Sequence, residues 1–359
     1  MSAKPATFDH PSRAVNPAAP PVWNEYADPE NAFRFVADSA SSLLGLIAFG
    51  AAFPARAELS LPMLSIPIEP LAAEQRVELW HSGLPVTRGA CNGVSFAHNG
   101  AVLFGTLSLS ESPAQRLETT TVQAYTRILD VIRAQQYPHL VRMWHYFPSI
   151  NLDTHGMERY RQFCMGRHQA FAERGLAPGP DLPAASAIGS RAPGLYVYFL
   201  AARTPGIAVE NPRQVSAYCY PPRYSPRQPA FSRAVIQDWG HERQIYISGT
   251  ASIVGHESRH RDDLAAQIEE TLGNIRALLR HAAGHSEKAL LDLHALSSVK
   301  VYLRRPDDLQ PARNILGTVF APDTQVLYLA GDICRSELLI EIEGVMRLPC
   351  SGTGHASTA

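Results

Sequence analysis

A succession of strand, helix and strand occurs twice in this 359-residue chain, and the repeat constrains the fold more than any other feature. In each copy an apolar strand contains a Gly-Thr dipeptide, the helix has one apolar face, and the second strand ends at a proline. These features are Gly105–Thr106, a helix over 118–136 and Pro148 in the first copy, and Gly249–Thr250, a helix over 263–282 and Pro306 in the second. Each copy then adds another helix and strand. The repeat predicts an α/β (α+β) fold with two duplicated units, each a mixed β-sheet with packed helices.

Composition divides the chain into four predicted parts. Residues 1–30 are rich in Pro and Ala and predict a flexible arm, and residues 349–359 predict a disordered tail. The two repeated units are assigned to 31–193 and 194–348, because a loop rich in Pro, Ala, Gly and Ser ends at residue 193. Since 45% of the residues are hydrophobic and 18% are charged, we expect both units to have packed cores.

Charge and cysteine content narrow the class of function. The formal net charge of -1 offers no basic excess for nucleic acid and no single-sign field for a membrane surface. The five cysteines form no CxxC pair, which fits a reducing compartment. The N-terminus lacks the apolar core of a secretory signal, and the apolar stretch 39–53 is too short to span a bilayer. We expect a cytoplasmic protein that binds neither nucleic acid nor membrane.

The segment 256–260 reads His-Glu-Ser-Arg-His and fits the HExxH motif of zinc proteases. In those enzymes both histidines lie on one face of a formed helix. Here the motif follows a strand directly, and Asp262 and Asp263 are good N-cap residues for a helix that begins only after it. We therefore expect a polar loop and no metal site, with a zinc hydrolase as an alternative.

Two segments combine arginines with aromatic residues. The helix predicted over 157–171 contains Arg159, Arg161 and Arg167, which could bind an anion, and Gly166 in its middle needs a reason because glycine weakens a helix. The Pro-rich segment 211–233 holds tyrosines and arginines, which suit a small dianion through guanidinium pairs and phenol hydrogen bonds. The alternatives are an amphipathic helix with a solvated Arg face and a rigid surface loop.

The last predicted strand, 332–346, carries two acidic residues in an apolar sequence. Glu341 and Glu343 share one face by the period of two. Carboxylates are costly to bury unless they are used, and a buried Glu with a raised pKa can act as a general acid. The other interpretation is the exposed face of an edge strand.

Four segments resemble the chorismatases, in the same order along the chain. They are FPSIN…GMERYRQFCMGRHQAF, NPRQVSAYCYPPRYSPRQPAFSRA, ISGTASIVGHES and GDICRSELLIEIEG, within a similarity that covers about 80–346. The resemblance implies a fold related to the YjgF/RidA proteins and to trimeric chorismate mutase, with 194–348 as the catalytic half. It also implies cofactor-independent cleavage of the enolpyruvyl ether of chorismate to pyruvate and 3-hydroxybenzoate or 4-hydroxybenzoate. The alternatives are hydrolysis to a dihydroxycyclohexadiene carboxylate, and a YjgF/RidA-like protein that binds small molecules or hydrolyses imines.

The resemblance also assigns roles to residues. It makes Glu341 the acid that protonates the enolpyruvyl methylene, and it places Cys334 and Ala251 where the family varies with product. The residues expected to bind substrate are Arg159, Arg167, Tyr220, Tyr224, Arg233, Ser248, Gly249 and Arg335. No metal or other cofactor is expected, and chorismate is the expected partner. We expect a monomer, because a duplicated chain can supply contacts that a shorter relative makes between subunits.

Overall fold

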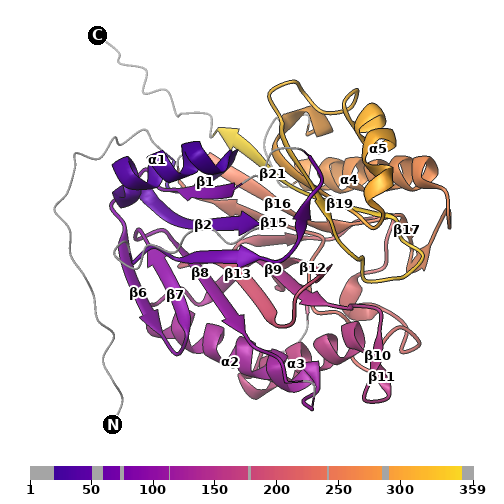
Figure 1. Ribbon diagram of the computed structural model, residues 1–359, viewed down its shortest axis with the longest axis horizontal. Helices are drawn as coiled ribbons and strands as arrows, with labels where there is room; N and C mark the ends of the chain where they lie inside the picture. The colour runs from indigo at the N-terminus through magenta and orange to yellow at the C-terminus, as the bar shows by residue number, and fades with distance from the viewer. Residues whose placement is uncertain are drawn as a thin grey trace.

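Three β-sheets surround one central core, and helices cover the outer face of each sheet (Figure 1). The structure is a computed structural model and describes residues 20–50, 60–72, 77–112, 114–176, 179–240, 242–284 and 291–349. Within these residues no helix is both long and apolar enough to cross a bilayer.

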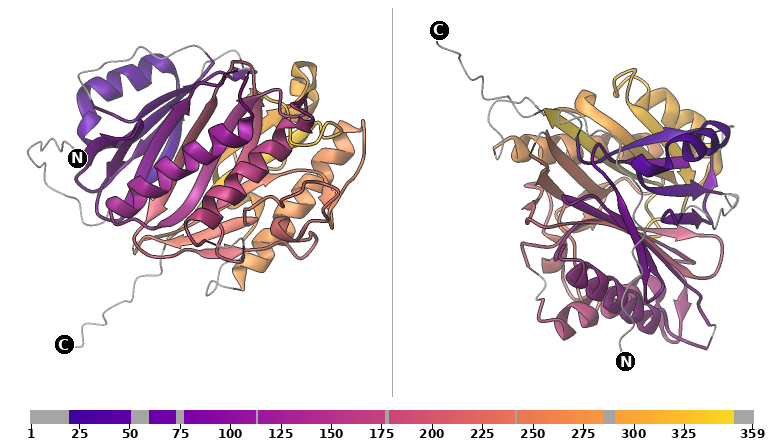
Figure 2. Two further views of the ribbon diagram at one scale, coloured as in Figure 1. Left: turned by 90° about the horizontal axis from the view of Figure 1, so that it is seen from below. Right: turned by 90° about the vertical axis from the view of Figure 1, so that its left-hand side faces the viewer.

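The first sheet has six strands in the order β12-β9-β13-β8-β7-β6. Its strands are β6 (Thr87–Cys91), β7 (Val94–His98), β8 (Val102–Leu109), β9 (His139–Pro148), β12 (Ala184–Ser190) and β13 (Leu195–Ala202). Helices α2 (Leu117–Ala134) and α3 (Arg159–Glu173) pack on its outer face (Figure 2). A small hairpin of β10 (Asp153–Thr154) and β11 (Met157–Glu158) precedes α3.

The second sheet repeats this arrangement and has seven strands in the order β14-β15-β16-β21-β19-β20-β4. Its strands are β4 (Glu69–Pro70), β14 (Ile207–Val209), β15 (Ala234–Asp238), β16 (Glu242–Thr250), β19 (Leu296–Leu303), β20 (Gln325–Ala330) and β21 (Ile340–Pro349). Helices α4 (Leu264–Ala283) and α5 (Leu309–Leu316) cover it. A hairpin of β17 (Ile253–Val254) and β18 (Glu257–Ser258) follows β16.

The two sheets correspond strand by strand, which confirms the predicted duplication. In each unit the last strand lies between the strand that precedes the first helix and the strand that follows it. The resulting strand orders are β8-β13-β9-β12 and β16-β21-β19-β20. The β9/β12 and β19/β20 pairs are parallel, and the other neighbours in these two sets are antiparallel. Because β13 belongs to the first sheet, the boundary between the units lies after Ala202 and not at the expected 193/194.

A third sheet, which the repeat did not predict, is built from the N-terminal residues. Its order is β1-β5-β2-β3, from β1 (Trp23–Ala27), β2 (Leu43–Phe49), β3 (Met63–Ile66) and β5 (Val77–His81), with α1 (Pro29–Ser39) on its outer face. The sequence of elements and the pairing directions match those of the other two sheets. The fold is therefore the expected duplication plus a shorter third copy. Residues 23–30 belong to this copy and not to a flexible arm; residues 1–19 and 350–359 lie outside the described part of the chain.

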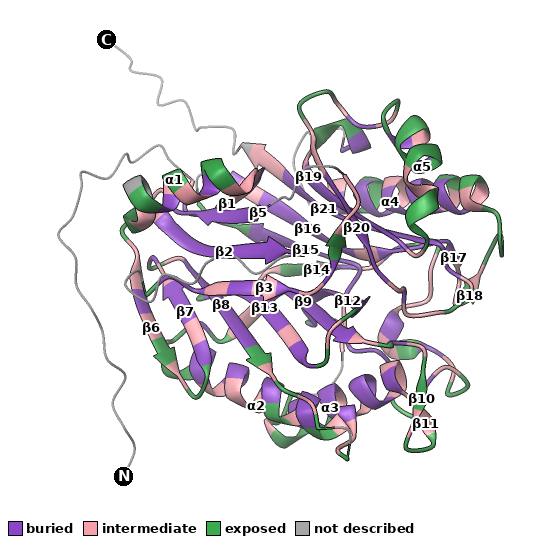
Figure 3. Ribbon diagram, in the orientation of Figure 1, coloured by how far each residue is buried: buried purple, intermediate pink, exposed green. Residues whose placement is uncertain are grey.

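The inner faces of all three sheets meet in one hydrophobic core. Trp80 of the third sheet, Trp144 of the first and Tyr302 of the second are all buried in it. Figure 3 shows the buried strands in the centre and the exposed positions on the outer helices and loops. Short 3-10 turns complete the fold: η1 (Ala40–Ser42), η3 (Ala217–Cys219), η4 (Leu293–Ala295) and η5 (Pro306–Asp308).

Candidate active site

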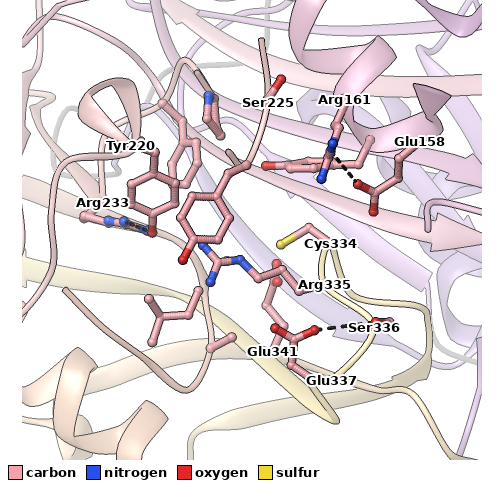
Figure 4. A pocket seen from close by; sticks show the side chains of 17 residues that line it. Glu158, Arg161, Tyr220, Ser225, Arg233, Cys334, Arg335, Ser336, Glu337 and Glu341 are labelled. Carbon is pink, nitrogen blue, oxygen red and sulfur yellow. Dashed lines mark hydrogen bonds and ion pairs between the residues drawn. The ribbon is translucent and has the colours of Figure 1, made fainter. Parts of the chain in front are cut away.

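A cavity of about 240 Å³ lies where the two large units meet. Segments from both units line it: β11 and the start of α3 from the first, and β16, β21, the 211–233 loop and the loop before β21 from the second (Figure 4). Its lining residues are Glu158, Tyr160, Arg161, Tyr220, Tyr224, Ser225, Pro229, Phe231, Arg233, Gly249, Ala251, Ile253, Cys334, Arg335, Ser336, Glu337 and Glu341. Eight of the eleven predicted site residues are among them.

Glu341 lies on β21 opposite Tyr302, lines the cavity, and is only 5% exposed. Gly249 of β16 lies against its carboxyl group, because a Cβ at this position would overlap Glu341 Oε1. Burial raises the pKa of Glu341 from its ordinary value to about 8, and the negative charge of Glu343 adds to this effect. A carboxyl group in this state keeps its proton at neutral pH and can donate it inside the cavity.

Glu343 shares the inward face of β21 but lies in a different environment. Its carboxylate accepts hydrogen bonds from Arg142 Nη2 at 2.7 Å, Trp144 Nε1 at 2.7 Å and Lys300 Nζ at 3.2 Å. Burial acts to raise the pKa of Glu343, but the charges of Arg142 and Lys300 outweigh it and hold the pKa below its ordinary value. The two glutamates are therefore opposite in protonation, one neutral and one ionised.

Two arginines and two tyrosines form one wall of the cavity. Arg233 is buried and donates from Nη2 to Tyr220 Oη at 2.8 Å, and Arg335 stacks over Tyr224 with its guanidinium carbon 4.2 Å from the ring centre. Arg233 Nε and Arg335 Nη2 are buried and have no hydrogen-bond partner. Because an unpaired buried donor costs free energy, these N–H groups are placed to donate hydrogen bonds to carboxylate oxygens.

An apolar wall faces the cavity near Glu341. Ala251, Ile253 and Cys334 pack in one hydrophobic cluster, and all three line the cavity. Burial raises the pKa of the Cys334 thiol to about 12, and the nearby Glu341 contributes. At neutral pH the Cys334 thiol therefore keeps its proton and is a poor nucleophile.

The loop that carries Cys334 replaces the first part of the last predicted strand. The sequence predicted a strand over 332–346, but β21 begins only at Ile340. Arg304 explains the difference, because its guanidinium pairs with Asp332 at 2.7 Å and donates to three backbone carbonyls of the loop, at Ile333, Arg335 and Leu338. These bonds hold the loop against the cavity.

Three predicted substrate-binding residues do not line the cavity. Arg159 pairs with Glu111 at 2.7 Å, and Ser248 is fully buried with its hydroxyl bonded to Ser232 O at 2.6 Å. Arg167 is buried beside the Phe163 ring. Gly166 has a structural reason, since a Cβ would overlap the backbone of α2, so it lets α2 and α3 pack closely and says nothing about Arg167 as a ligand.

The HExxH segment lies in the β17–β18 hairpin and the turn after it, and not in a helix. His256 Nδ1 lies 3.1 Å from Tyr224 Oη, whereas His260 Nε2 lies 3.2 Å from Glu270. Helix α4 begins after Asp263, whose side chain caps it as predicted. Among the described residues, no group of three or more His, Cys, Asp or Glu side chains is placed to hold a metal ion.

Sequence reasoning missed several cavity residues, among them Glu158 and Tyr160 of the first unit. Arg161, one of the arginines that the sequence offered as anion ligands, also lines the cavity, and its Nε pairs with Glu158 at 3.1 Å (Figure 4). The signal was the MERYR motif, which the sequence pattern predicts as part of one helix. In the structure α3 begins only at Arg159, so Glu158 belongs to β11 and faces the cavity from the hairpin.

The fold and the cavity define a small-molecule site in which a protonated carboxyl group faces guanidinium donors. Residues 78–201 match the family model described as "Chorismatase FkbO/Hyg5-like, N-terminal". A 3-hydroxybenzoate synthase of Streptomyces hygroscopicus is 39% identical over 297 residues, covering 80% of this chain and 85% of that protein. A chorismatase of Streptomyces rapamycinicus is 37% identical and covers 76% of this chain and 83% of its own length.

A solved chorismatase structure extends this result to the fold. A chorismatase crystal structure superposes with a TM-score of 0.84 at 32% identity, covering 93% of this chain and all of that one. A YjgF-family structure from Mycobacterium tuberculosis also aligns, at 19% identity and a TM-score of 0.27. The alignment covers 37% of this chain and 98% of that one. By its sequence relatives, the chain belongs to the chorismatase family.

Proposed function

We propose that this chorismatase cleaves the enolpyruvyl ether of chorismate to pyruvate and 3-hydroxybenzoate, with Glu341 as the proton donor. The observation that carries the proposal is the buried, protonated carboxyl group of Glu341 in the cavity. The choice of 3-hydroxybenzoate is supported by the relative named 3-hydroxybenzoate synthase, which covers 80% of this chain.

The proposed chemistry needs one proton and no added reactant. Glu341 protonates the methylene carbon of the enolpyruvyl group, and the electron pair of the C=C bond forms the new C–H bond, leaving an oxocarbenium ion. The neighbouring ring hydroxyl displaces the activated ether oxygen, which leaves as pyruvate. One C–O bond of the resulting arene-oxide-like ring breaks, a ring proton is lost and the freed oxygen gains a proton, giving 3-hydroxybenzoate, while the hydroxyl proton returns to the Glu341 carboxylate. General acid catalysis of this type contributes about 100- to 10,000-fold.

The guanidinium wall supports a dianionic substrate. Arg233 Nε and Arg335 Nη2 are buried donors without partners, and chorismate carries two carboxylates. In the proposed complex each arginine pairs with carboxylate oxygens, and the Tyr220 and Tyr224 hydroxyls complete the wall. Arg161, on the opposite unit, is available to the second carboxylate if its pair with Glu158 opens.

The apolar wall supports the aromatic product over the hydrolysis product. Ala251 and Cys334 pack with Ile253 beside Glu341, and such side chains offer an incoming water molecule few hydrogen bonds. Attack by the ring hydroxyl within the substrate needs no water, whereas hydrolysis to the dihydroxycyclohexadiene carboxylate does. We therefore assign product selection to Cys334 and Ala251.

The test is to incubate the purified protein with chorismate and measure pyruvate and the ring product separately. We expect equal amounts of pyruvate and 3-hydroxybenzoate, and loss of both in Glu341→Gln, which keeps the shape but has no transferable proton. A dihydroxycyclohexadiene carboxylate would instead support the hydrolase alternative. The absence of any pyruvate would contradict the proposal that the protein cleaves chorismate. Activity that is lost on chelation and restored by zinc would support the zinc hydrolase alternative.

We further propose that the chain acts as a cytoplasmic monomer. One chain supplies both walls of the cavity and three sheets around one core, so the cavity needs no second subunit. Light scattering coupled to gel filtration tests this directly. A stable dimer or trimer at assay concentrations would contradict it.

A further inference from the structure

A cluster of buried charges lies beside Glu341, where the three sheets meet. Glu343 of β21 binds Arg142 of β9 and Lys300 of β19, and Lys300 Nζ also donates to Glu78 of β5 at 3.0 Å. Tyr198 of β13 donates to Glu78 Oε2 at 2.9 Å and accepts from Lys300 at 2.9 Å. The cluster thus takes a charged residue from every sheet.

The charges of this cluster balance without Glu341. Two carboxylates, Glu78 and Glu343, face two cations, Arg142 and Lys300, and none of the four is more than 3% exposed. Each carboxylate has a cation within 3.2 Å. A third negative charge on the same face of β21 has no cation of this cluster left to pair with.

Ser186 and Gly249 link the cluster to Glu341. Ser186 Oγ donates to Glu343 Oε2 and accepts from the Gly249 backbone N–H at 2.9 Å. Gly249 in turn lies against the Glu341 carboxyl group. Residues two apart on a strand are separated by about 7 Å, so the fixed charge of Glu343 acts on Glu341 through a buried region in which charge interactions are strong.

We propose that Glu343 is a positioning residue whose negative charge, added to the effect of burial, keeps Glu341 protonated, and that Arg142 and Lys300 keep Glu343 ionised for this purpose. The inference rests on the proposed role of Glu341 as the acid. It assigns a function in catalysis to a cluster that could otherwise serve only to join the three sheets. The opposite pKa directions of the two glutamates agree with it.

Other groups around Glu341 modify this effect. The titratable and charged groups that face it are Glu343 on its own strand, Arg142 on β9, Tyr160 on α3, Cys334 in the loop before β21, and Arg233 and Arg304. The three arginines oppose Glu343. Arg142 is paired with Glu343 and Arg304 with Asp332, whereas Arg233 bonds only to the neutral groups Tyr220 and Val215 O, and its Nε has no partner.

The experiment compares pH profiles of kcat/KM for the parent, Glu343→Gln and Glu343→Gln/Arg142→Met. The double variant removes Arg142, the cation that Glu343→Gln would leave buried and unpaired, while Lys300 keeps its pair with Glu78, so it protects against a failure to fold. We expect the basic limb of the profile to move about one pH unit lower in Glu343→Gln, because a like charge has been removed from the acid, and to move in the same direction by less in the double variant, because a cation that opposes Glu343 has been removed as well. Below that limb, kcat/KM should stay within about tenfold of the parent, since Glu341 itself is intact.

Infrared difference spectroscopy supplies a measurement that needs no turnover. The difference between the parent and Glu341→Gln isolates the carboxylic acid band of Glu341, and we expect the parent band to titrate well above the ordinary range of a glutamate. An ordinary titration in the parent overturns the proposal, and so does an unmoved basic limb in variants that fold. If Glu341→Gln keeps its activity, the proposed acid is wrong; if it is inactive and only the limb fails to move, the role of Glu343 alone is wrong.

Discussion

The last strands of the two large units occupy the same place in their sheets but carry different chemistry. In the second unit β21 presents Glu341 and Glu343 inward, whereas in the first unit β13 presents Tyr198 and Leu200 to the central core. The first unit has kept the fold and supplies Tyr160 and Arg161 to the cavity wall. In the proposed mechanism one copy therefore holds the acid, and the other shapes the space around it.

The matched Gly-Thr dipeptides offer the largest test of this comparison. A Cβ on Gly249 would overlap the Glu341 carboxyl group, whereas one on Gly105 would overlap the Phe199 ring in the core. We expect Gly249→Ala to lower kcat/KM about 100-fold or more by displacing the acid. Gly105→Ala should instead cost about 1–3 kcal/mol of stability through overpacking. Denaturant titration and pyruvate release on both variants check this, and equal activity losses would contradict the division of roles.

Two predicted substrate-binding arginines differ in the same way. Arg335 lines the cavity with a free donor, but Arg159 is held by Glu111 outside it. Arg335→Ala should raise KM about 10- to 100-fold, because a charge-assisted hydrogen bond to substrate is lost. Arg159→Ala should lower Tm and leave KM near the parent value, because it leaves the carboxylate of Glu111 without its cation. A raised KM in Arg159→Ala at unchanged Tm would return it to the substrate site.

The protonation of Glu341 predicts a smaller effect on stability. Its pKa is raised from 4.5 to about 8 in the folded protein, so its contribution to stability is complete below its unfolded pKa and is lost as the pH rises through 8. Glu341→Gln has no such loss. The Tm of the variant relative to the parent should therefore be higher at pH 9 than at pH 5, by thermal unfolding in matched buffers. A constant difference between the two proteins would mean that Glu341 titrates normally.

The sequence predicted the regular parts of the fold well, because their signals are local. The helices expected over 118–136 and 263–282 are observed as α2 (Leu117–Ala134) and α4 (Leu264–Ala283), each with the predicted apolar face buried. The third sheet escaped prediction because β3 has only four residues and the copy has no Gly-Thr dipeptide. Its relation to the other two is visible only in strand pairing, which is a long-range property.

The site was predictable in part for the same reason. Glu341 and Glu343 stood out together as carboxylates on an apolar strand, and family resemblance chose Glu341 and named most of the wall. Arg167 and Ser248 lie outside the cavity for reasons that leave no pattern in the sequence. For Arg167 the reason is the close packing of α2 on α3, and for Ser248 it is a hydrogen bond to the backbone carbonyl of Ser232. The loop 331–339 has no hydrophobic periodicity that would predict its path. Arg304, whose hydrogen bonds hold this loop in place, lies just after β19.

The smallest expected effect concerns product choice at Cys334. The neutral thiol packs with Ala251 and Ile253 beside the acid, so Cys334→Ala opens space without removing a charge or the proton donor. We expect total pyruvate release to stay within a few-fold of the parent, while water entering the enlarged space raises the share of the dihydroxycyclohexadiene carboxylate. Chromatography of the ring products at equal pyruvate yield measures the ratio. Cys164→Ala is the matched control, because Cys164 is a fully buried thiol in the core of the first unit and does not line the cavity. If both variants give the parent ratio, Cys334 does not select the product; if both change it equally, the effect comes from a general loosening of the fold.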